Sequence, residues 1–190
     1  MSEPIKFSRT RDLFGWCSNF APYPTRILVP DPSLGHLVEV CGKTSEHVYQ
    51  AMKFWYTDPA YSRQILQITR PGDAALLGRV NAEMRDMTFD TYKDALMSIV
   101  CLAKMTQNNL EEWLLLSEER EIQEDSPKDY YWGIGADGTG RNQLGKTWMV
   151  IRQHLKGGTL QTYHDNISLE MRGYVVPRYR ENVSLFWTGD

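Results

Sequence analysis

The sequence predicts an α+β fold: a mostly helical single domain with a small antiparallel sheet. Its 190 residues are 42% hydrophobic and 24% charged, as is usual for a globular chain of one domain. Apolar residues recur every three to four positions in several long segments, a spacing typical of amphipathic helices. Extended, strand-like runs are shorter and fewer, and prolines and glycines separate the segments.

Two strands and a helix are expected first along the chain. Residues 26–29 and 37–41 read as strands, joined in a hairpin whose turn lies at residues 31–35. A helix then follows, because the hydroxyl of Thr44 or Ser45 is suited to cap free backbone N–H groups. We expect this helix to run to residue 54 or 56.

Four further helices are expected in the middle of the chain. Asp58 followed by Pro59 starts one toward residue 67, and residues 71–80 form a second, short one. Asp90 caps a third, longer helix with one apolar face. For the fourth, Asn108 with a glutamate three residues later resembles a capping box that opens a helix to residue 116.

Residues 126–143 are rich in glycine and aromatic residues and predict a loop. Gly138 after Asp137 indicates a tight turn, and Asn142 is expected to cap the next helix, which the glycine pair at 157 and 158 ends. Beyond it, residues 173–176 look strand-like. We expect a domain over residues 1–157 and a C-terminal extension over 158–190, packed on the domain or trailing from it.

Charge and composition exclude several classes of protein. With 21 basic and 24 acidic residues the formal charge is −3, which argues against non-specific coating of nucleic acid. Three cysteines form no C-x-x-C pair, and four histidines are scattered, so we expect reduced thiols, no metal site and no cofactor. The chain start lacks a secretory signal and no run is apolar enough for a membrane span. A cytoplasmic protein without a membrane partner is expected.

The first candidate site lies on the helix that follows residue 44. Gln50 and Lys53 come four and seven residues after Glu46, so a carboxylate, an amide and an ammonium share one helix face. Taken singly, Glu46 suits the positive end of a helix and Lys53 suits a solvent-exposed surface. Because the three side chains share one helix face, a catalytic role for them is the alternative interpretation.

Two loops supply further candidates. In residues 126–143, glycines such as Gly133 and Gly138 allow close approach of a phosphate, and Trp132 is suited to stack on a base. In residues 14–20, the polar Ser18 and Asn19 lie between aromatic residues, one of which is Phe20, and suit contact with a base edge. Composition alone favours a turn-rich connection at residues 126–143, with its aromatic side chains in the core. At residues 14–20 an ordinary aromatic turn is equally expected.

These segments, taken in order, resemble the NADAR (YbiA-like) family, over roughly residues 5–156. The matching motifs are F-G-W-C-S-N-F at 14–20, T-S-E-H-V-Y-Q-A-M-K-F at 44–54, L-G-R at 77–79, A-K with Q-N at 103–108, and the stretch 126–152. One departure is Phe89, which stands where the family commonly has tryptophan. A phenylalanine ring still stacks on a base but lacks the indole N–H donor.

The resemblance implies an N-glycosidase, a hydrolase of bonds between ribose C1 and nitrogen. It carries functional roles onto Glu46, Lys53 and Asp129, which we expect to be catalytic. The substrate-binding residues expected from the motifs and loops are Ser18, Asn19, Phe20, Gln50, Phe89, Trp132, Gly133, Asp137, Gly138 and Asn142.

The sequence leaves three functions open. We favour removal of ADP-ribose from guanine in nucleic acid, with an ADP-ribosyltransferase toxin as an implied partner. The alternatives are cleavage of a phosphoribosylamino-pyrimidine, a small ribosyl-phosphate intermediate of riboflavin synthesis, and a non-catalytic module that binds ADP-ribose-like nucleotides. In an enzyme, Glu46 offsets positive charge at C1 and orients water, and Asp129 supports it or shuttles a proton. Lys53 either pairs with a phosphate or attacks C1 of the opened sugar as a Schiff base.

Overall fold

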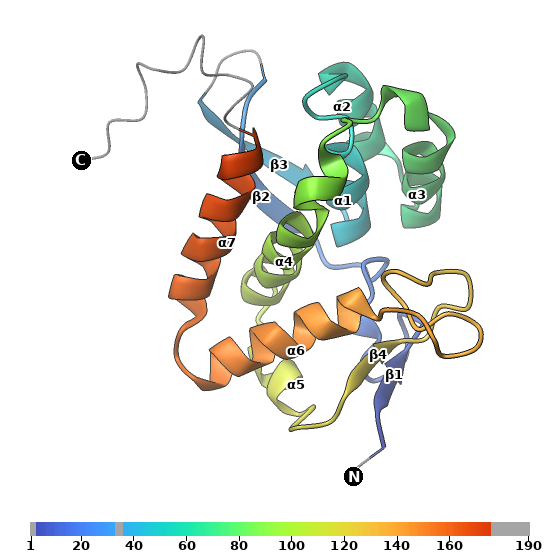
Figure 1. The fold of residues 1–190 in the computed structure, drawn as a ribbon, viewed down its shortest axis with the longest axis vertical. Coiled ribbons are helices and arrows are strands. Elements are labelled where there is room, and N and C mark those ends of the chain that lie inside the picture. The colour runs from blue at the N-terminus through green and yellow to red at the C-terminus, as the bar shows by residue number, and fades with distance from the viewer. Residues whose placement is uncertain (1–2, 33–35, 176–190) are drawn as a thin grey trace.

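The computed structural model describes residues 3–32 and 36–175. Within them the chain forms seven α-helices, two single-turn 3₁₀ helices at Gly15–Cys17 and Ala82–Met84, and two small sheets (Figure 1). The α-helices are α1 (Ser45–Met52), α2 (Pro59–Gln67), α3 (Pro71–Val80), α4 (Phe89–Gln107), α5 (Glu111–Leu115), α6 (Gln143–Lys156) and α7 (Leu160–Val175). The strands are β1 (Ile5–Phe7), β2 (Thr25–Pro30), β3 (Leu37–Gly42) and β4 (Ile122–Glu124). The α+β fold class is confirmed.

The expected hairpin is the antiparallel pair of β2 and β3, in register from Thr25 opposite Gly42 to Pro30 opposite Leu37. The backbone N–H of Asp31 donates to the carbonyl of His36 and closes the hairpin, while residues 33–35 of the expected turn lie outside the described residues. The second sheet was not expected. In it, β1 pairs in parallel with β4, more than a hundred residues along the chain.

The long helix α4 is the centre of the core. Its buried face includes Tyr92, Leu96, Val100 and Met105, and it contacts β2, α1, α6 and α7. Figure 1 shows α1, α2 and α3 gathered at one end of α4, and α5, α6 and the β1–β4 sheet at the other. The site described below forms where these two groups meet.

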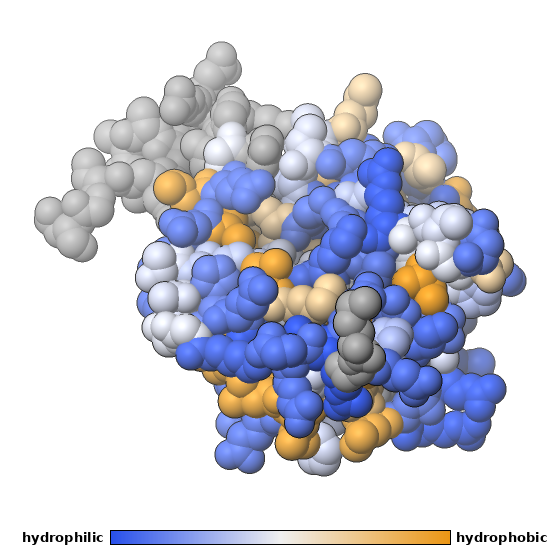
Figure 2. Space-filling model, turned by 60° about the horizontal axis from the view of Figure 1, so that its bottom comes forward, coloured by the Kyte–Doolittle hydropathy of each residue, from blue (hydrophilic) through white to orange (hydrophobic). Residues whose placement is uncertain are grey.

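The surface is mainly polar on the face shown in Figure 2, where hydrophobic residues appear in small groups between hydrophilic ones. Among the described residues, no helix is both long and apolar enough to cross a membrane.

The expected helix starts are confirmed at α2 and α3 and differ in detail elsewhere. Asp58 caps α2 as expected, since its carboxylate accepts from the backbone N–H of Tyr61 at 2.9 Å. Thr44 precedes α1, but its hydroxyl bonds the His47 ring at 2.9 Å instead of a free backbone N–H. That helix ends at Met52, earlier than expected, and turns follow it.

Two other expected caps, Asp90 and Asn108, are wrong, and Asn142 occupies the N-cap position of α6 without a capping hydrogen bond. In each case the polar side chain bonds another partner. Asp90 lies inside the first turn of α4 and binds Arg85 and Lys93. The Asn108 amide donates to carbonyls of residues 24 and 104, and α5 begins only at residue 111. Asn142 precedes α6 with a left-handed φ of 52°, and its side chain bonds the backbone of β4 instead of capping the helix.

The C-terminal part of the described chain is helical, so the strand expected at 173–176 is wrong for residues 173–175. Residue 176 lies outside the described residues. The glycine pair does end α6, with Gly158 at a φ of +66°. The following helix, α7, packs along α4 and contributes Ile167 and Met171 to the main hydrophobic core. These two apolar residues lie four positions apart, on one helix face.

Candidate active site

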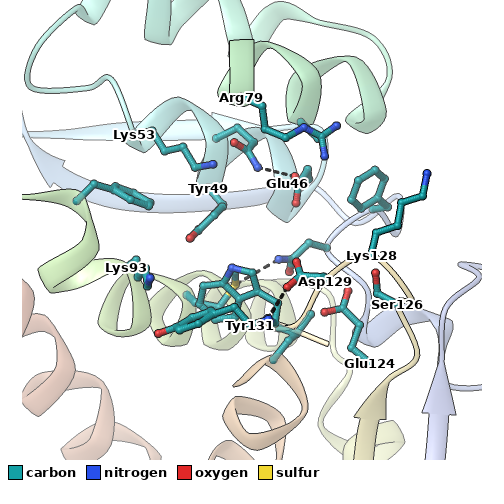
Figure 3. Close-up of a pocket in the computed structure, with 18 of the residues that line it drawn as sticks. Glu46, Tyr49, Lys53, Arg79, Lys93, Glu124, Ser126, Lys128, Asp129 and Tyr131 are labelled. Atoms are coloured by element: carbon teal, nitrogen blue, oxygen red, sulfur yellow. Dashed lines mark hydrogen bonds between the residues drawn. The ribbon is translucent and has the colours of Figure 1, made fainter. Parts of the chain in front are cut away.

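A cavity of about 420 Å³ opens between α1, the start of α4 and the loop that follows β4 (Figure 3). Its wall combines five basic side chains, four acidic ones and several aromatic rings. The lining residues are Asn19, Phe20, Glu46, Tyr49, Gln50, Lys53, Ala75, Arg79, Arg85, Phe89, Asp90, Lys93, Met97, Glu124, Ser126, Lys128, Asp129, Tyr131, Trp132 and Leu144. A volume of this order suits a small-molecule or nucleotide-sized group.

Glu46 lies in the first turn of α1 and is buried at the cavity wall. The Gln50 amide donates to its Oε1 at 2.7 Å, so the spacing of four residues forms the contact that the sequence predicts. Burial raises the pKa of Glu46, while the hydrogen bond from Gln50 and the charges of Lys53 and Arg79 act in the opposite direction. A carboxyl group with a raised pKa is better suited to accept and return a proton than an exposed one.

Lys53 follows the last turn of α1 and its side chain enters the same cavity. The ammonium lies 5.4 Å from the centre of the Tyr49 ring and 5.9 Å from that of Phe89. Burial lowers the pKa of Lys53 to about 8; the Glu46 charge opposes this shift and the neighbouring Arg85 adds to it. A lysine of this kind holds far more neutral amine at pH 7 than an exposed one, as lysine nucleophiles require.

Asp129 reaches the cavity from the loop after β4. Its Oδ1 accepts the backbone N–H of Tyr131 at 2.9 Å and that of Trp132 at 2.7 Å, and these bonds hold the loop in a turn. The Trp132 ring then meets Tyr49 of α1 edge to face, at 5.6 Å between centres. This contact joins the loop to the helix that carries the other candidate catalytic groups. The structure therefore brings Glu46, Lys53 and Asp129 to one cavity.

The loop at residues 14–20 contributes Asn19 and Phe20 to the cavity, whereas Ser18 lies outside it. The Ser18 hydroxyl accepts the backbone N–H of Phe20 at 3.2 Å and so shapes the loop. Below the loop, the buried ammonium of Lys104 donates to the carbonyls of Trp16 and Ser18 at 2.9 and 3.1 Å. Lys104, noted in the sequence only as part of a motif, thus fixes the loop in place.

Besides Ser18, four of the expected binding residues do not line the cavity. Asp137 and Gly138 lie on an exposed turn, where the Asp137 carboxylate bonds Thr139. Gly133 packs so tightly that an added Cβ would lie 2.9 Å from the carbonyl oxygen of residue 124. Buried Asn142 joins α6 to β4 through its side chain. These positions shape the loop around the cavity, and direct substrate contact by them stays a prediction.

Phe89 lines the cavity but is only 1% exposed. Its ring meets those of Tyr49 and Tyr92 edge to face, at 5.4 and 5.3 Å between centres. The ring therefore supports the cavity wall next to Lys53.

Several lining residues were missed by sequence reasoning. Two of them, Arg85 and Lys93, share the carboxylate of Asp90, at 2.6 and 3.1 Å. Arg79 was visible only as part of the L-G-R motif; there, Gly78 lies against the Gln50 side chain and allows α3 to approach α1 closely. Nothing in the local sequence around residues 85, 93 and 128 marks these three cations as members of one site.

Glu124 is the most informative of the missed residues. It ends β4, and burial together with the charges of Asp129 and Glu46 raises its pKa to about 8, against a smaller opposing effect of Lys104. In Figure 3 its carboxyl group lies beside Asp129 and below Glu46. Three carboxyl groups thus face one part of the cavity, while Lys53 and Lys93 lie toward the other. Among the described residues, no group of three or more His, Cys, Asp or Glu is arranged to hold a metal ion.

Comparison with known proteins agrees with the motifs. The NADAR domain model matches residues 6–156. N-glycosidase YbiA of Escherichia coli is 33% identical over 155 residues, covering 80% of this chain and 88% of that protein. N-glycosidase Npun_R5314 of Nostoc punctiforme is 32% identical over 154 residues, covering 80% and 92%. A riboflavin biosynthesis protein of Vibrio vulnificus, VVA0006, is 34% identical over 160 residues, which are 82% of this chain and 40% of that longer one.

The fold agrees as well. The NMR structure of the Escherichia coli protein YbiA superposes with a TM-score of 0.69 at 31% identity, covering 84% of this chain and 89% of that one. The family model spans the elements that build the cavity, from β1 to α6. This chain belongs to the NADAR family.

Proposed function

We propose that this protein is an N-glycosidase that hydrolyses the bond between a nitrogen and C1 of a phosphate-bearing ribose. The observation that carries the proposal is one cavity in which Glu46 and Lys53 meet beside a group of cations. Relatives named N-glycosidases support the reaction type. Breaking a ribosyl C–N bond requires groups that stabilise charge developing at C1 and on the departing nitrogen.

Lys53 acts as the nucleophile in this proposal. Its neutral amine attacks C1 of the opened sugar and forms a Schiff base, which splits one difficult displacement into two easier steps. The low pKa, the burial and the flanking rings of Tyr49 and Phe89 support this role over simple pairing with a phosphate. Pairing with phosphate would be served equally well by an exposed lysine.

Glu46 acts as the base in the second step. Gln50 holds one carboxylate oxygen and so orients the group in the cavity. The carboxylate takes a proton from the water that attacks C1 of the Schiff base, and its charge stabilises the positive charge on C1 and Nζ before that attack. Asp129 supports this arrangement by holding the loop that closes the cavity.

The cations hold the phosphate of the substrate. Arg85 and Lys93 are fixed by Asp90 at the start of α4, and Arg79 approaches from α3. Guanidinium groups are suited to bind phosphate oxygens in pairs.

ADP-ribose attached to guanine is the first candidate substrate. A second hollow of about 600 Å³ shares Phe20, Glu124 and Ser126 with the cavity and is lined further by Arg9 and Arg11. Two hollows that share part of their lining offer room for more than one nucleotide, and Arg9 and Arg11 offer charge for a second phosphate. ADP-ribosyl transfer is the class of reaction that would supply this substrate, so an ADP-ribosyltransferase is the implied partner.

A phosphoribosylamino-pyrimidine is the second candidate. Relatives named for riboflavin biosynthesis in Vibrio vulnificus and Zea mays favour it, although the matching region is only 40% and 25% of those proteins. One ribosyl phosphate with one pyrimidine also suits the volume of the first cavity alone.

One incubation distinguishes the candidates. The protein is mixed separately with a guanine-ADP-ribosylated oligonucleotide and with the phosphoribosylamino-pyrimidine, and the products are analysed by mass spectrometry. Release of ADP-ribose with recovery of the oligonucleotide carrying unmodified guanine supports the first candidate, and consumption of the pyrimidine compound supports the second. If neither compound is consumed but the protein binds ADP-ribose, the enzymatic proposal is contradicted and a binding module is favoured.

A further inference from the structure

Glu124 is held rigidly at the edge of the cavity. Its backbone N–H donates to the side chain of Asn142 at 3.0 Å, and its carbonyl accepts from the N–H groups of Ser126 and Ile134 at 3.0 and 2.9 Å. As the last residue of β4 it also pairs with Phe7 of β1. Bonds on both sides of the residue therefore fix where its side chain leaves the backbone.

One oxygen of this side chain has no partner. Oε2 of Glu124 is buried from solvent, and no protein group bonds it. A buried, unpaired carboxyl oxygen is far less unfavourable when it carries a proton. The surrounding charges favour the same state, because Asp129 and Glu46 repel a carboxylate here more than Lys104 attracts it, and the pKa is raised to about 8.

The position of Glu124 is distinctive as well. It lines both the cavity that contains Lys53 and the second hollow beside Arg9 and Arg11. Figure 3 shows its carboxyl group next to Asp129, across the cavity from Glu46. A group bonded to C1 of a ribose held near Lys53 and Glu46 would pass Glu124 on its way into the second hollow.

We propose that Glu124 is the general acid of the reaction and protonates the nitrogen that leaves C1. This inference rests on the proposed N-glycosidase function and adds to it the source of the proton. A departing amine or base nitrogen needs such a proton, since without it the nitrogen would leave as an unstable anion.

The proton and electron balance closes with groups already in the site. The neutral amine of Lys53 bonds C1 while the C1–O bond of the ring breaks, and the proton that Nζ loses passes to the ring oxygen. Glu124 then gives its proton to the leaving nitrogen, which keeps the electron pair of the broken C1–N bond, and the remaining lone pair of Nζ forms the double bond to C1. Water adds to C1 and gives a proton to Glu46, which passes it to Nζ as the C1–Nζ bond breaks. The sugar hydroxyl then forms the aldehyde by releasing a proton, and Glu124 regains one from solvent.

The test is the pH dependence of kcat/KM in Glu124→Gln, with the substrate that the wild-type protein consumes. The wild-type rate is expected to rise with pH as Lys53 loses its proton and to fall again as Glu124 loses its own, both near pH 8. The variant is expected to lose about 10²–10⁴-fold in rate and to lose the fall at high pH while keeping the rise. The charged groups around residue 124, namely Glu46, Lys104, Arg9, Arg11, Asp125 and Asp129, are unchanged in the variant.

Controls separate the acid role from a structural one. Glu121→Gln alters an exposed glutamate just before β4 and is expected to match the wild-type rate. Glu124→Asp keeps an acid and is expected to recover at least tenfold over the Gln variant, with a fall at high pH; it also carries the test should the Gln variant fail to fold. A Gln variant that keeps the high-pH fall, or more than a tenth of the rate, overturns the proposal for Glu124. A wild-type protein that cleaves no ribosyl C–N bond overturns the proposed function itself.

Discussion

Sodium borohydride reduces a Schiff base to a stable secondary amine, and we expect such an adduct on Lys53 when it is added during turnover. The fraction of Lys53 that is neutral, and so able to react, follows from its lowered pKa. With a pKa of about 8, about a tenth of Lys53 is neutral at pH 7, against about 0.03% of a lysine at the ordinary value of 10.5. The reactive form is therefore enriched about 300-fold over that of an exposed lysine.

The assay is peptide mass spectrometry after incubation with substrate and borohydride at pH 7. The ribosyl adduct is expected on the peptide that contains Lys53 and not on Lys93, which also lines the cavity but is paired with Asp90. Lys53→Arg keeps the positive charge and is expected to give no adduct. Absence of any adduct on Lys53, while substrate is consumed, would refute the nucleophile and leave the residue an electrostatic role.

Two further predictions concern stability. Lys104→Met removes charge-assisted hydrogen bonds to buried loop carbonyls; a loss of about 3 kcal/mol in the free energy of unfolding is expected in urea titration, and an unchanged midpoint would contradict it. The pKa of Glu124 is raised from 4.5 to about 8. Its ionisation therefore leaves the free energy of unfolding unchanged below pH 4.5 and lowers it increasingly between pH 4.5 and pH 8. Glu124→Gln should therefore melt at a higher temperature than wild type at pH 8.5 but not at pH 4, and an equal difference at both would argue against it.

Local sequence pattern was sufficient where a neighbouring residue provides the partner. The contact between Glu46 and Gln50 follows from helical spacing, and the cap at Asp58 follows from the proline after it. The caps expected from Asn142 and Asp90 do not form because their side chains have tertiary partners. The side chain of Asn142 bonds the β4 backbone, and that of Asp90 binds two cations. The α7 helix was missed because its apolar face is completed only by α4.

For the site, too, the sequence did not reveal residues that come together only in the folded chain. The family resemblance singled out Glu46, Lys53 and Asp129, which line one cavity in the structure, but it did not single out Arg85, Lys93 or Glu124. Their contribution depends on how α4 and β4 are placed in space, and no spacing along the chain encodes that. For the glycine-rich loop, in contrast, the sequence suggested a binding role, whereas the structure shows a packing role for Gly133. Its glycines resembled a phosphate cradle, but Gly133 serves close packing against the backbone of residue 124.

The most direct measurement of the central idea compares Glu46→Gln with wild type for both turnover and affinity for the substrate. Glutamine preserves the size of the side chain and the contact with Gln50, but it cannot take a proton from water. We predict a fall in kcat of about 10²–10⁴-fold, together with substrate affinity within a few-fold of wild type. A folded Glu46→Gln protein that turns over at more than a tenth of the wild-type rate would contradict the account.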